Sequence, residues 1–192
     1  MQRGKHSSDG GSAQSAAASP ALDALGRSVK SASFPEEFCS ELSKMFQVLS
    51  TEVALFRVED GQLKFLYPVA LRTAGSIPLS SSAIAAHTAV GQKAELYNNF
   101  PRIKHASIFE HVKLTQRDED SAGGRPIQKL MSAPVLDAKG HVLGVIQISR
   151  KGYDLISAGP DFTLEQLQHL ERAASLAARA PFMQSNFKLP TK

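Results

Sequence analysis

The sequence predicts an α+β fold, in which a central, mostly antiparallel sheet of about five or six strands packs against segregated helices. Two observations support this prediction. Two pairs of aliphatic and β-branched segments each flank a tight-turn signal, and amphipathic helical stripes stand at both ends of the body. The elements follow in the order helix, hairpin, short helix, strand, short helix, hairpin and long helix.

The first helix is expected over about 34–50. Ser33 and Glu36 fit a capping box, and Pro35 suits a first helical turn. Apolar residues then recur at helical spacing: Phe38, Leu42, Met45, Phe46 and Leu49. This spacing predicts one amphipathic helix with a single buried face.

A hairpin follows, with strands over 52–58 and 62–70. Both segments are rich in aliphatic, aromatic and β-branched side chains, and Asp60-Gly61 between them is a tight-turn signal. Pro68 places the second strand at a sheet edge or marks its end, because proline cannot donate a ladder hydrogen bond.

The middle of the chain is expected to form short elements joined by loops. Three serines can cap a short helix over 80–91, and Gly91 suits its end. Alternation predicts a short strand over 93–97, and a second short helix is expected over 104–114. The polar, charged and glycine-containing segment 115–126 predicts a mobile loop.

The strongest strand signal lies in the last third of the body. Strands over 127–136 and 141–149 flank a turn at 137–140, and both are apolar enough to be central. Gly144 within the second strand marks close packing or a bulge.

The last helix begins with a capping box at Thr163 and Gln166, and Pro181 ends it. Its apolar residues step at helical intervals: Leu164, Leu167, Leu170, Ala174 and Ala177. Two interpretations of this stripe stay open. It covers the sheet, or it forms a close helical contact with a second copy of the chain.

Composition divides the chain into three parts. Residues 1–33 are rich in Ser, Ala and Gly and cannot bury enough apolar area to offset their conformational entropy. We expect a disordered tail there, with disorder to about residue 20 and a fraying helical turn near Leu22 and Leu25; the alternative is a short partner-binding segment. Residues 34–180 form one domain, and 181–192 form a C-terminal tail.

The charge distribution argues against a polyanion-binding surface. The chain carries 22 Lys and Arg against 18 Asp and Glu, a formal net charge of +4. Residues 34–180 hold 16 of each sign, so the excess lies in the two ends. We therefore expect no specific nucleic acid as a partner. No apolar run approaches the roughly 20 residues of a membrane span, and no targeting segment is recognised, so we expect no membrane contact and a cytoplasmic location.

Motifs of known enzyme chemistry are scarce. There is no phosphate-binding loop, dinucleotide fingerprint or nucleophile elbow. Cys39 is the only cysteine, which excludes an internal disulfide and a two-thiol redox couple. No two histidines are spaced to place two ligands on one face of an element, so no metal site is expected. The acidic run 118–120 is interpreted as a solvated loop.

Three stretches resemble the GAF family of small-molecule sensor domains. Residues 77–99 look like the family's short helix and third strand, and 127–152 look like its hairpin with a glycine turn. Residues 161–180 are similar to its C-terminal helix. With the first helix and hairpin, the resemblance covers about 34–180.

The resemblance implies a GAF/PAS-like arrangement of the sheet. The N- and C-terminal helices would cover one face, and in the family they often pair with a second copy. The other face would enclose a ligand beneath short helices and loops, here 80–91, 104–114 and 115–126.

Functional sub-patterns of the family fit this chain poorly. Cyclic-nucleotide-binding members carry an Asn-Lys pair after the last strand, where this chain has Arg150-Lys151. The acidic positions that follow in those members fall on Gln166 and Leu167. Members that reduce free methionine sulfoxide use several cysteines, and members that attach a bilin need one beside the pocket. Cys39 alone, on a helix expected on the opposite face, fits neither role.

The resemblance favours a non-catalytic regulatory module that binds a small molecule and forms a homodimer through its terminal helices. His87 or Ser132 would supply hydrogen bonds, and aromatic side chains would stack on the ligand or exclude water. The predicted ligand-binding residues are Ile84, His87, Thr88, Tyr97, Phe109, Met131 and Ser132. For the histidine and the apolar side chains, packing in the core is the competing interpretation. These residues name neither a ligand nor a cofactor.

Two other functions stay open. The first is an interaction or scaffold domain without a ligand, which contacts a protein partner. The second is an enzyme of unrecorded type, in which His87, Tyr97 and Asn98 would form a convergent polar site. A cavity filled by side chains favours the former, and polar groups meeting in a cleft with shifted pKa values favour the latter.

Overall fold

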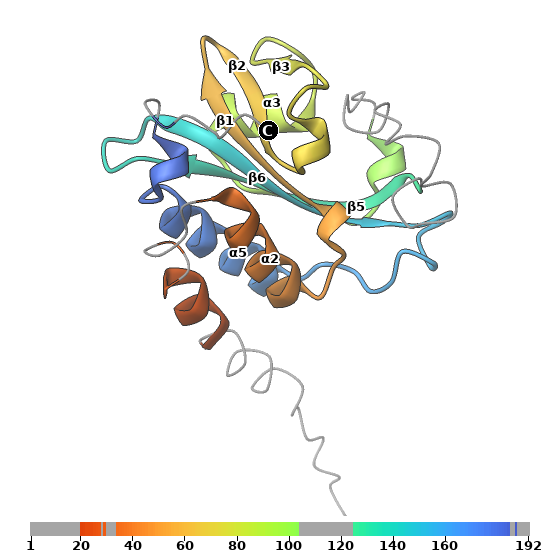
Figure 1. The fold of residues 1–192 in the computed structure, drawn as a ribbon. Helices are drawn as coiled ribbons and strands as arrows, with labels where there is room; N and C mark the ends of the chain where they lie inside the picture. Colours follow the sequence, from red (N-terminus) through yellow and green to blue (C-terminus); the bar gives the residue numbers. More distant parts are fainter. Residues whose placement is uncertain (1–19, 28, 30–33, 104–124, 185–186, 188–192) are drawn as a thin grey trace, which may run out of the picture.

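The computed structural model describes residues 20–27, 29, 34–103, 125–184 and 187. These residues form a six-stranded sheet between two unequal layers of helices, as Figure 1 shows. The strand order is β3-β2-β1-β6-β5-β4, and every neighbouring pair is antiparallel. The strands are β1 (Val53–Glu59), β2 (Gln62–Tyr67), β3 (Ser76–Pro78), β4 (Glu95–Tyr97), β5 (Ile127–Leu136) and β6 (Val142–Lys151). The predicted α+β class is confirmed.

The two predicted hairpins form the middle of the sheet. β1 and β2 turn at Asp60 and Gly61, whose φ angles of 49° and 73° lie in the left-handed region that a type I′ turn requires. β5 and β6 turn at 137–140, where Asp137 accepts a hydrogen bond from the backbone amide of His141 at 2.8 Å. Because β1 pairs with β6, the two hairpins join into one ladder.

Gly144 lies where β6 passes closest to its neighbours. A Cβ at this position would overlap the carbonyl oxygen of Phe56 and press on the side chain of Met183. The close approach therefore requires glycine, as the sequence predicted.

Two short strands form the edges of the sheet. β3 was not predicted, because three residues are too few to show a periodicity. β2 ends at Tyr67, so Pro68 marks the end of the strand. β4 pairs with β5 through three residues, Glu95–Tyr97.

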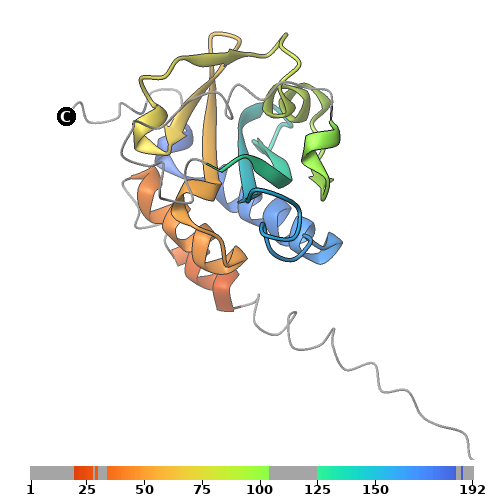
Figure 2. The same cartoon turned by 90° about the vertical axis from the view of Figure 1, so that its right-hand side faces the viewer.

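Helices α2 (Pro35–Phe46) and α5 (Leu164–Ala177) lie together on one face of the sheet, and α3 (Ile84–Gly91) lies on the other; Figure 2 shows the same layers from the side. α5 begins with the predicted capping box. The Thr163 hydroxyl accepts from the backbone amide of Gln166 at 3.1 Å, and the Gln166 side chain accepts from that of Thr163 at 3.0 Å. Short 3₁₀ turns join the main elements at Ser50–Glu52, Val69–Leu71, Phe100–Arg102 and Pro181–Met183.

α2 is shorter than predicted. It ends at Phe46 because Gln47 adopts a left-handed conformation, with φ of 52°. Its N-cap is Phe34, whose side chain makes no capping hydrogen bond. Ser33, the predicted cap, lies outside the described residues, as do the predicted helix 104–114 and nearly all of the predicted loop 115–126.

The buried core is divided by the sheet. The larger apolar cluster lies on the face of α2 and α5 and includes Phe38, Leu42, Met131, Ile146, Leu170 and Phe182. A smaller cluster lies on the face of α3 and includes Phe56, Leu63, Phe65, Ala85, Ala86 and Val145. The sheet therefore has two covered faces with separate packing.

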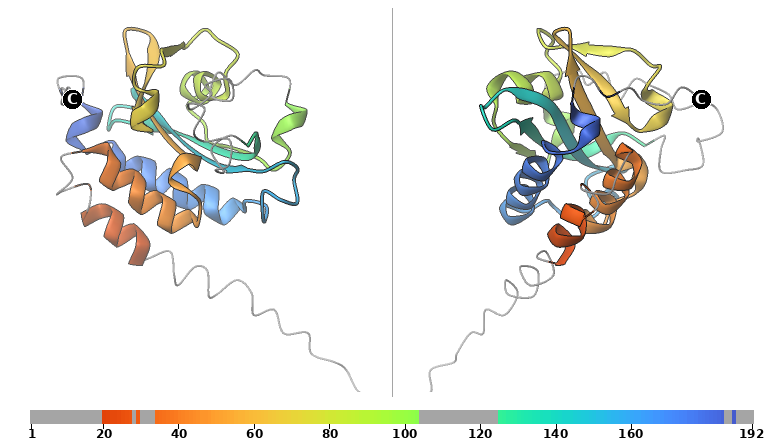
Figure 3. Two further views of the ribbon diagram at one scale, coloured as in Figure 1. Left: turned by 45° about the vertical axis from the view of Figure 1, so that its right-hand side comes forward. Right: turned by 60° about the vertical axis from the view of Figure 1, so that its left-hand side comes forward.

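A short helix before α2 packs against the domain. Residues 20–27 are helical, and Leu25 and Val29 are buried in the larger cluster. Figure 3 shows this N-terminal helix beside α2 and α5. The helix is longer and better packed than the fraying turn expected near Leu22 and Leu25, because a short helix that is marginal alone is stabilised by packing. Residues 1–19 lie outside the described residues.

The segment after α5 also packs against the domain. Phe182 and Met183, in the segment 181–192 that the sequence predicts as a C-terminal tail, are buried in the larger cluster. Arg57 of β1 fixes this segment by donating to the carbonyl oxygens of Phe182 at 3.0 Å, Gln184 at 3.2 Å and Phe187 at 3.1 Å. The chain thus folds back onto the sheet after α5.

Asn98, directly after β4, joins the edge of the sheet to the start of α5. Its Nδ2 donates to the carbonyl oxygen of Phe162, and its Oδ1 accepts from the amide of Phe162, both at 2.9 Å. The Phe162 ring is buried, and the guanidinium of Arg150 lies 4.8 Å from its centre. These contacts set where α5 begins relative to β4.

Candidate functional site

The face of the sheet beneath α3 carries a row of polar side chains across three strands. β4 and β5 pair Glu95 with Ser132, and β5 and β6 pair Ser132 with Gln147. Tyr97, two residues after Glu95, points to the same side of β4. With two residues of α3, these side chains form what we call the Glu95 cluster: His87, Thr88, Glu95, Tyr97, Ser132 and Gln147.

Glu95 is the centre of this cluster. Its Oε1 lies 3.0 Å from the hydroxyl of Tyr97 and 2.8 Å from Nδ1 of His87, and its Oε2 lies 2.9 Å from Oγ1 of Thr88. The Glu95 side chain is 17% exposed, whereas that of His87 is 67% exposed. The carboxylate is therefore mostly enclosed, and the imidazole covers it from the solvent side.

A chain of hydrogen bonds leads from the sheet to this carboxylate. Oγ1 of Thr88 lies 2.7 Å from Oγ of Ser132, and Nε2 of Gln147 donates to that same Oγ at 3.3 Å. An ionised carboxylate only accepts, and each hydroxyl has one hydrogen to give. Thr88 therefore donates to Glu95, and Ser132 donates to Thr88. All three donor residues of this chain are buried, so its direction is fixed toward Glu95.

Tyr97 is held as a neutral donor. Burial, and then the Glu95 carboxylate that accepts its hydrogen bond, raise the pKa of Tyr97 to about 12. The phenol therefore keeps its proton at neutral pH and directs it at Oε1 of Glu95.

The arrangement suits binding through hydrogen bonds and charge. The Ser132 hydroxyl contacts Thr88 and Gln147, and His87 contacts Glu95, so the histidine does not activate the serine.

Within the part of the chain that the structure describes, no three His, Cys, Asp or Glu side chains gather as a metal site requires. The acidic run 118–120 lies outside that part. None of the described helices is long and apolar enough to cross a membrane.

Comparison with protein-family models matches the GAF domain over residues 36–180. The chain belongs to the GAF domain family. The resemblance of the three sequence stretches is thus confirmed, and so is the expected placement of the terminal helices and α3 on opposite faces of the sheet.

Solved GAF domains share this fold at low sequence identity. The GAF domain of a phosphoenolpyruvate-protein phosphotransferase from Coxiella burnetii is 13% identical, with a TM-score of 0.62 over 85% of this chain and 92% of that chain. Its counterpart from Acinetobacter is 12% identical, with a TM-score of 0.61 over 84% and 91%. Free methionine-R-sulfoxide reductase from Neisseria meningitidis, solved in complex with its substrate, is 13% identical, with a TM-score of 0.59 over 93% and 95%. No curated protein matches the sequence.

This GAF domain brings together four of the seven predicted ligand-binding residues: His87, Thr88, Tyr97 and Ser132. Ile84 lies on the same face but is buried in a small apolar cluster with Phe100, Ile127 and Leu130. Phe109 lies outside the described residues.

The prediction that Met131 lines the same pocket is wrong. Met131 is fully buried in the larger cluster on the face of α2 and α5. Consecutive residues of a strand point to opposite faces, so Met131 and Ser132 cannot line one cavity.

The sequence prediction missed Glu95 and Gln147. Glu95 precedes Tyr97 by two residues in a predicted strand, and this spacing places both side chains on one face. Gln147 carried no such local signal, because its position opposite Ser132 depends on the register of the hairpin.

Cys39 and the Glu95 cluster lie on opposite faces of the sheet. The cysteine is fully buried on α2. Burial, and then the negative charge of Glu36, raise the pKa of the Cys39 thiol well above its usual value. The thiol therefore stays protonated and poorly nucleophilic.

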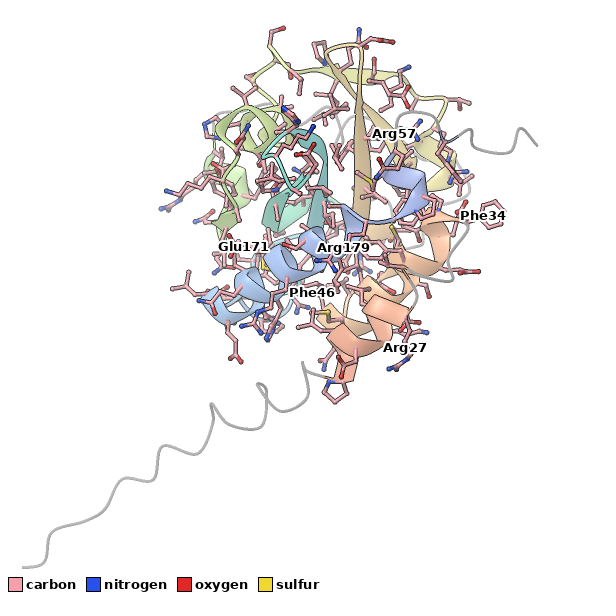
Figure 4. All side chains as sticks on the ribbon, turned by 90° about the vertical axis from the view of Figure 1, so that its left-hand side faces the viewer. Arg27, Phe34, Phe46, Arg57, Glu171 and Arg179 are labelled. Carbon is pink, nitrogen blue, oxygen red and sulfur yellow. The ribbon has the colours of Figure 1, made fainter. Side chains whose placement is uncertain are left out.

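Most of the apolar stripe of α5 covers this chain's own sheet, although Leu164 at its start is exposed. Leu170, Ala174 and Ala177 are buried in the larger cluster. A groove of about 530 Å³ lies further out, between the N-terminal helix and the end of α5. Figure 4 labels Arg27 of the N-terminal helix and Arg179, just after the end of α5, which both line the groove.

Proposed function

We propose that this GAF domain is a non-catalytic regulatory module that binds a small molecule on the α3 face of its sheet, at the Glu95 cluster. The supporting observation is the directed hydrogen-bond chain from Gln147 through Ser132 and Thr88 to Glu95. A buried polar group weakens a fold unless it is fully paired. On the opposite face of the sheet, the neighbouring positions of the same two strands, Met131 and Ala133 of β5 and Ile146 and Ile148 of β6, are apolar.

One structural neighbour supports this use of the fold. The reductase from Neisseria meningitidis was solved with its substrate, so in that protein a chain of this fold holds a small molecule. From this neighbour we infer only that the fold can hold a small molecule, and we infer nothing about which molecule this chain binds.

Catalysis is the competing function, because that neighbour is an enzyme. Two observations favour the non-catalytic role. Cys39, the one cysteine of the chain, is buried on the face away from the Glu95 cluster. Asn98, expected in a convergent polar site with His87 and Tyr97, uses its amide to hold the backbone of Phe162.

We test the binding function by a thermal-shift screen of nucleotides, amino acids and organic acids. A compound at about 100 times its Kd stabilises the native state by about 2.7 kcal/mol, which raises the Tm of a domain of this size by roughly 5–10 °C. The shift should shrink in Ser132→Ala and persist in Ser175→Ala, which removes an exposed hydroxyl from α5. If no compound raises the Tm, the scaffold function replaces this proposal.

We also propose that the domain forms a homodimer through its terminal helices. The buried stripe of α5 is not available for this contact. A second copy would contact the outer side of the N-terminal helix and α5, around the groove beside Leu22 and Leu176. Sedimentation velocity across the micromolar range should show a dimer, and a monomer at every concentration would exclude it.

A further inference from the structure

We propose that the ligand of the Glu95 cluster carries a cationic nitrogen group with N–H donors, an ammonium or a guanidinium, which binds Glu95 in the place of His87. This inference rests on the proposed function and specifies the chemistry of the ligand.

The first support is the charge around Glu95. Among the described residues, its ion-pair partner is His87, which is charged only when protonated. Its other two donors, Tyr97 and Thr88, are neutral hydroxyls. An enclosed carboxylate without a permanent cation gains most from a ligand that brings one.

Two other carboxylates, Glu59 and Asp161, are paired with permanent cations. Glu59 contacts both Arg57 and Lys64, although its side chain is more exposed than that of Glu95. Asp161, on the surface, pairs with the buried Lys129 at 2.7 Å. Among the described residues, Glu95 is an enclosed carboxylate that does not contact the lysine or arginine that Glu59 and Asp161 have.

The second support is the direction of the hydrogen bonds. Thr88 and Tyr97 both give their single hydrogens to Glu95, so the cluster offers a ligand the acceptor positions of the carboxylate. A carboxylate has about four such positions, and Thr88, Tyr97 and His87 occupy three of them. An ammonium or guanidinium fits the remaining positions, and an anionic group is repelled.

The third support is the exposure of His87. Its side chain is 67% exposed and contacts the cluster through Nδ1 alone. Exposed ion pairs of this kind contribute little to stability, so His87 can leave Glu95 without disturbing the buried hydrogen bonds. Its departure vacates an acceptor position on Oε1, on the solvent side of the carboxylate.

The test compares small probes of matched size. Butylamine, putrescine and agmatine carry N–H cations; butanol and butyrate are the neutral and anionic controls, and tetramethylammonium is a cation without N–H donors. Binding is measured at pH 7.5 by calorimetry and by thermal shift on the full chain. We expect the amines and agmatine to bind, and the three controls to bind at least about tenfold more weakly.

Three variants locate the contact. Glu95→Gln keeps the shape but removes the charge, and should weaken amine binding by about tenfold or more. His87→Ala should tighten amine binding, because the ligand no longer has to displace the imidazole from Oε1. Glu171→Gln, which removes an exposed charge from α5 (Figure 4), should have no effect.

Several outcomes overturn the inference. Equal binding of butylamine and butanol, or binding that survives Glu95→Gln, excludes the cationic anchor. If Glu95→Gln fails to fold, the ranking of the probes on the unaltered chain still decides. If the amines do not bind but a nucleotide or organic acid raises the Tm in a Ser132-dependent way, the binding function stands and the ligand class is wrong. If nothing binds, both are wrong.

Discussion

On the face covered by α2 and α5, β5 presents Met131 and Ala133, whereas on the face of α3 it presents Ser132 between them. β6 repeats the contrast, with Ile146 on the first face and Gln147 on the second. One hairpin therefore builds an apolar surface and a polar row from alternate residues. The same strands therefore pack an apolar core on one face and carry a connected row of polar side chains on the other.

The face covered by α2 and α5 should contribute more to stability than the face covered by α3. Phe38 of α2 is fully buried, and its ring centre lies 5.8 Å from that of Phe182. Phe38→Ala should lower the free energy of unfolding by about 3–5 kcal/mol, because it removes buried apolar surface and leaves a cavity. Urea titration measures this loss. Val90→Ala, at an exposed position of α3, is the control and should change stability by less than about 0.5 kcal/mol; equal effects would refute the comparison.

The contact of Asn98, which links the end of β4 to the start of α5, should have the next largest effect on stability. Asn98→Ala leaves the amide and the carbonyl of Phe162 without their side-chain partners. We expect a loss of about 2 kcal/mol and faster hydrogen exchange at the first turn of α5. Asn99→Ala, at the next position, is the matched control. Unchanged exchange in Asn98→Ala would show that α5 holds its start by other contacts.

A smaller effect is expected inside the Glu95 cluster. Thr88→Val keeps the shape of the side chain but removes both its hydrogen bonds, at a cost of about 1–2 kcal/mol. Because Ser132 donates to Thr88, the variants Thr88→Val and Ser132→Ala should be non-additive by about 0.5 kcal/mol or more. A double-mutant cycle measures this coupling, and additive effects would mean that the two hydroxyls act independently.

The smallest expected effect is on the pH dependence of stability through Tyr97. Burial and the hydrogen bond to Glu95 raise the pKa of Tyr97 to about 12, above the ordinary value of 10.0. The fold therefore favours the neutral phenol, so this contribution to stability is complete below pH 10 and is lost as the pH rises from 10 to 12. Ultraviolet titration of phenolate should show one tyrosine shifting to lower pKa in Glu95→Gln. An unchanged titration curve would contradict the contact.

Elements with local signals were predicted from the sequence. The turn at Asp60 and Gly61 needs two residues that tolerate positive φ, and the start of α5 needs Thr163 and Gln166 three residues apart. The turn and the capping box each lie within four consecutive residues, so both can be predicted without knowledge of distant contacts.

Features that depend on distant contacts were not predicted. The N-terminal helix is stabilised by burial of Leu25 in a core formed by residues far along the chain. Assigning Met131 and Ser132 to one pocket overlooked the alternation of a strand that had itself been predicted. Applied strictly, the same alternation would have grouped Glu95 with Tyr97.

The contact of Arg57 with the C-terminal segment has a mechanical consequence. Its guanidinium binds the carbonyl oxygens of Phe182, Gln184 and Phe187, and β1 lies inside the sheet between β2 and β6. A tension applied at the C-terminal segment is therefore passed through the Arg57 contacts to β1 and its two ladders in the middle of the sheet. The same tension also acts on the helix layer, because Phe182 packs against Phe38 of α2.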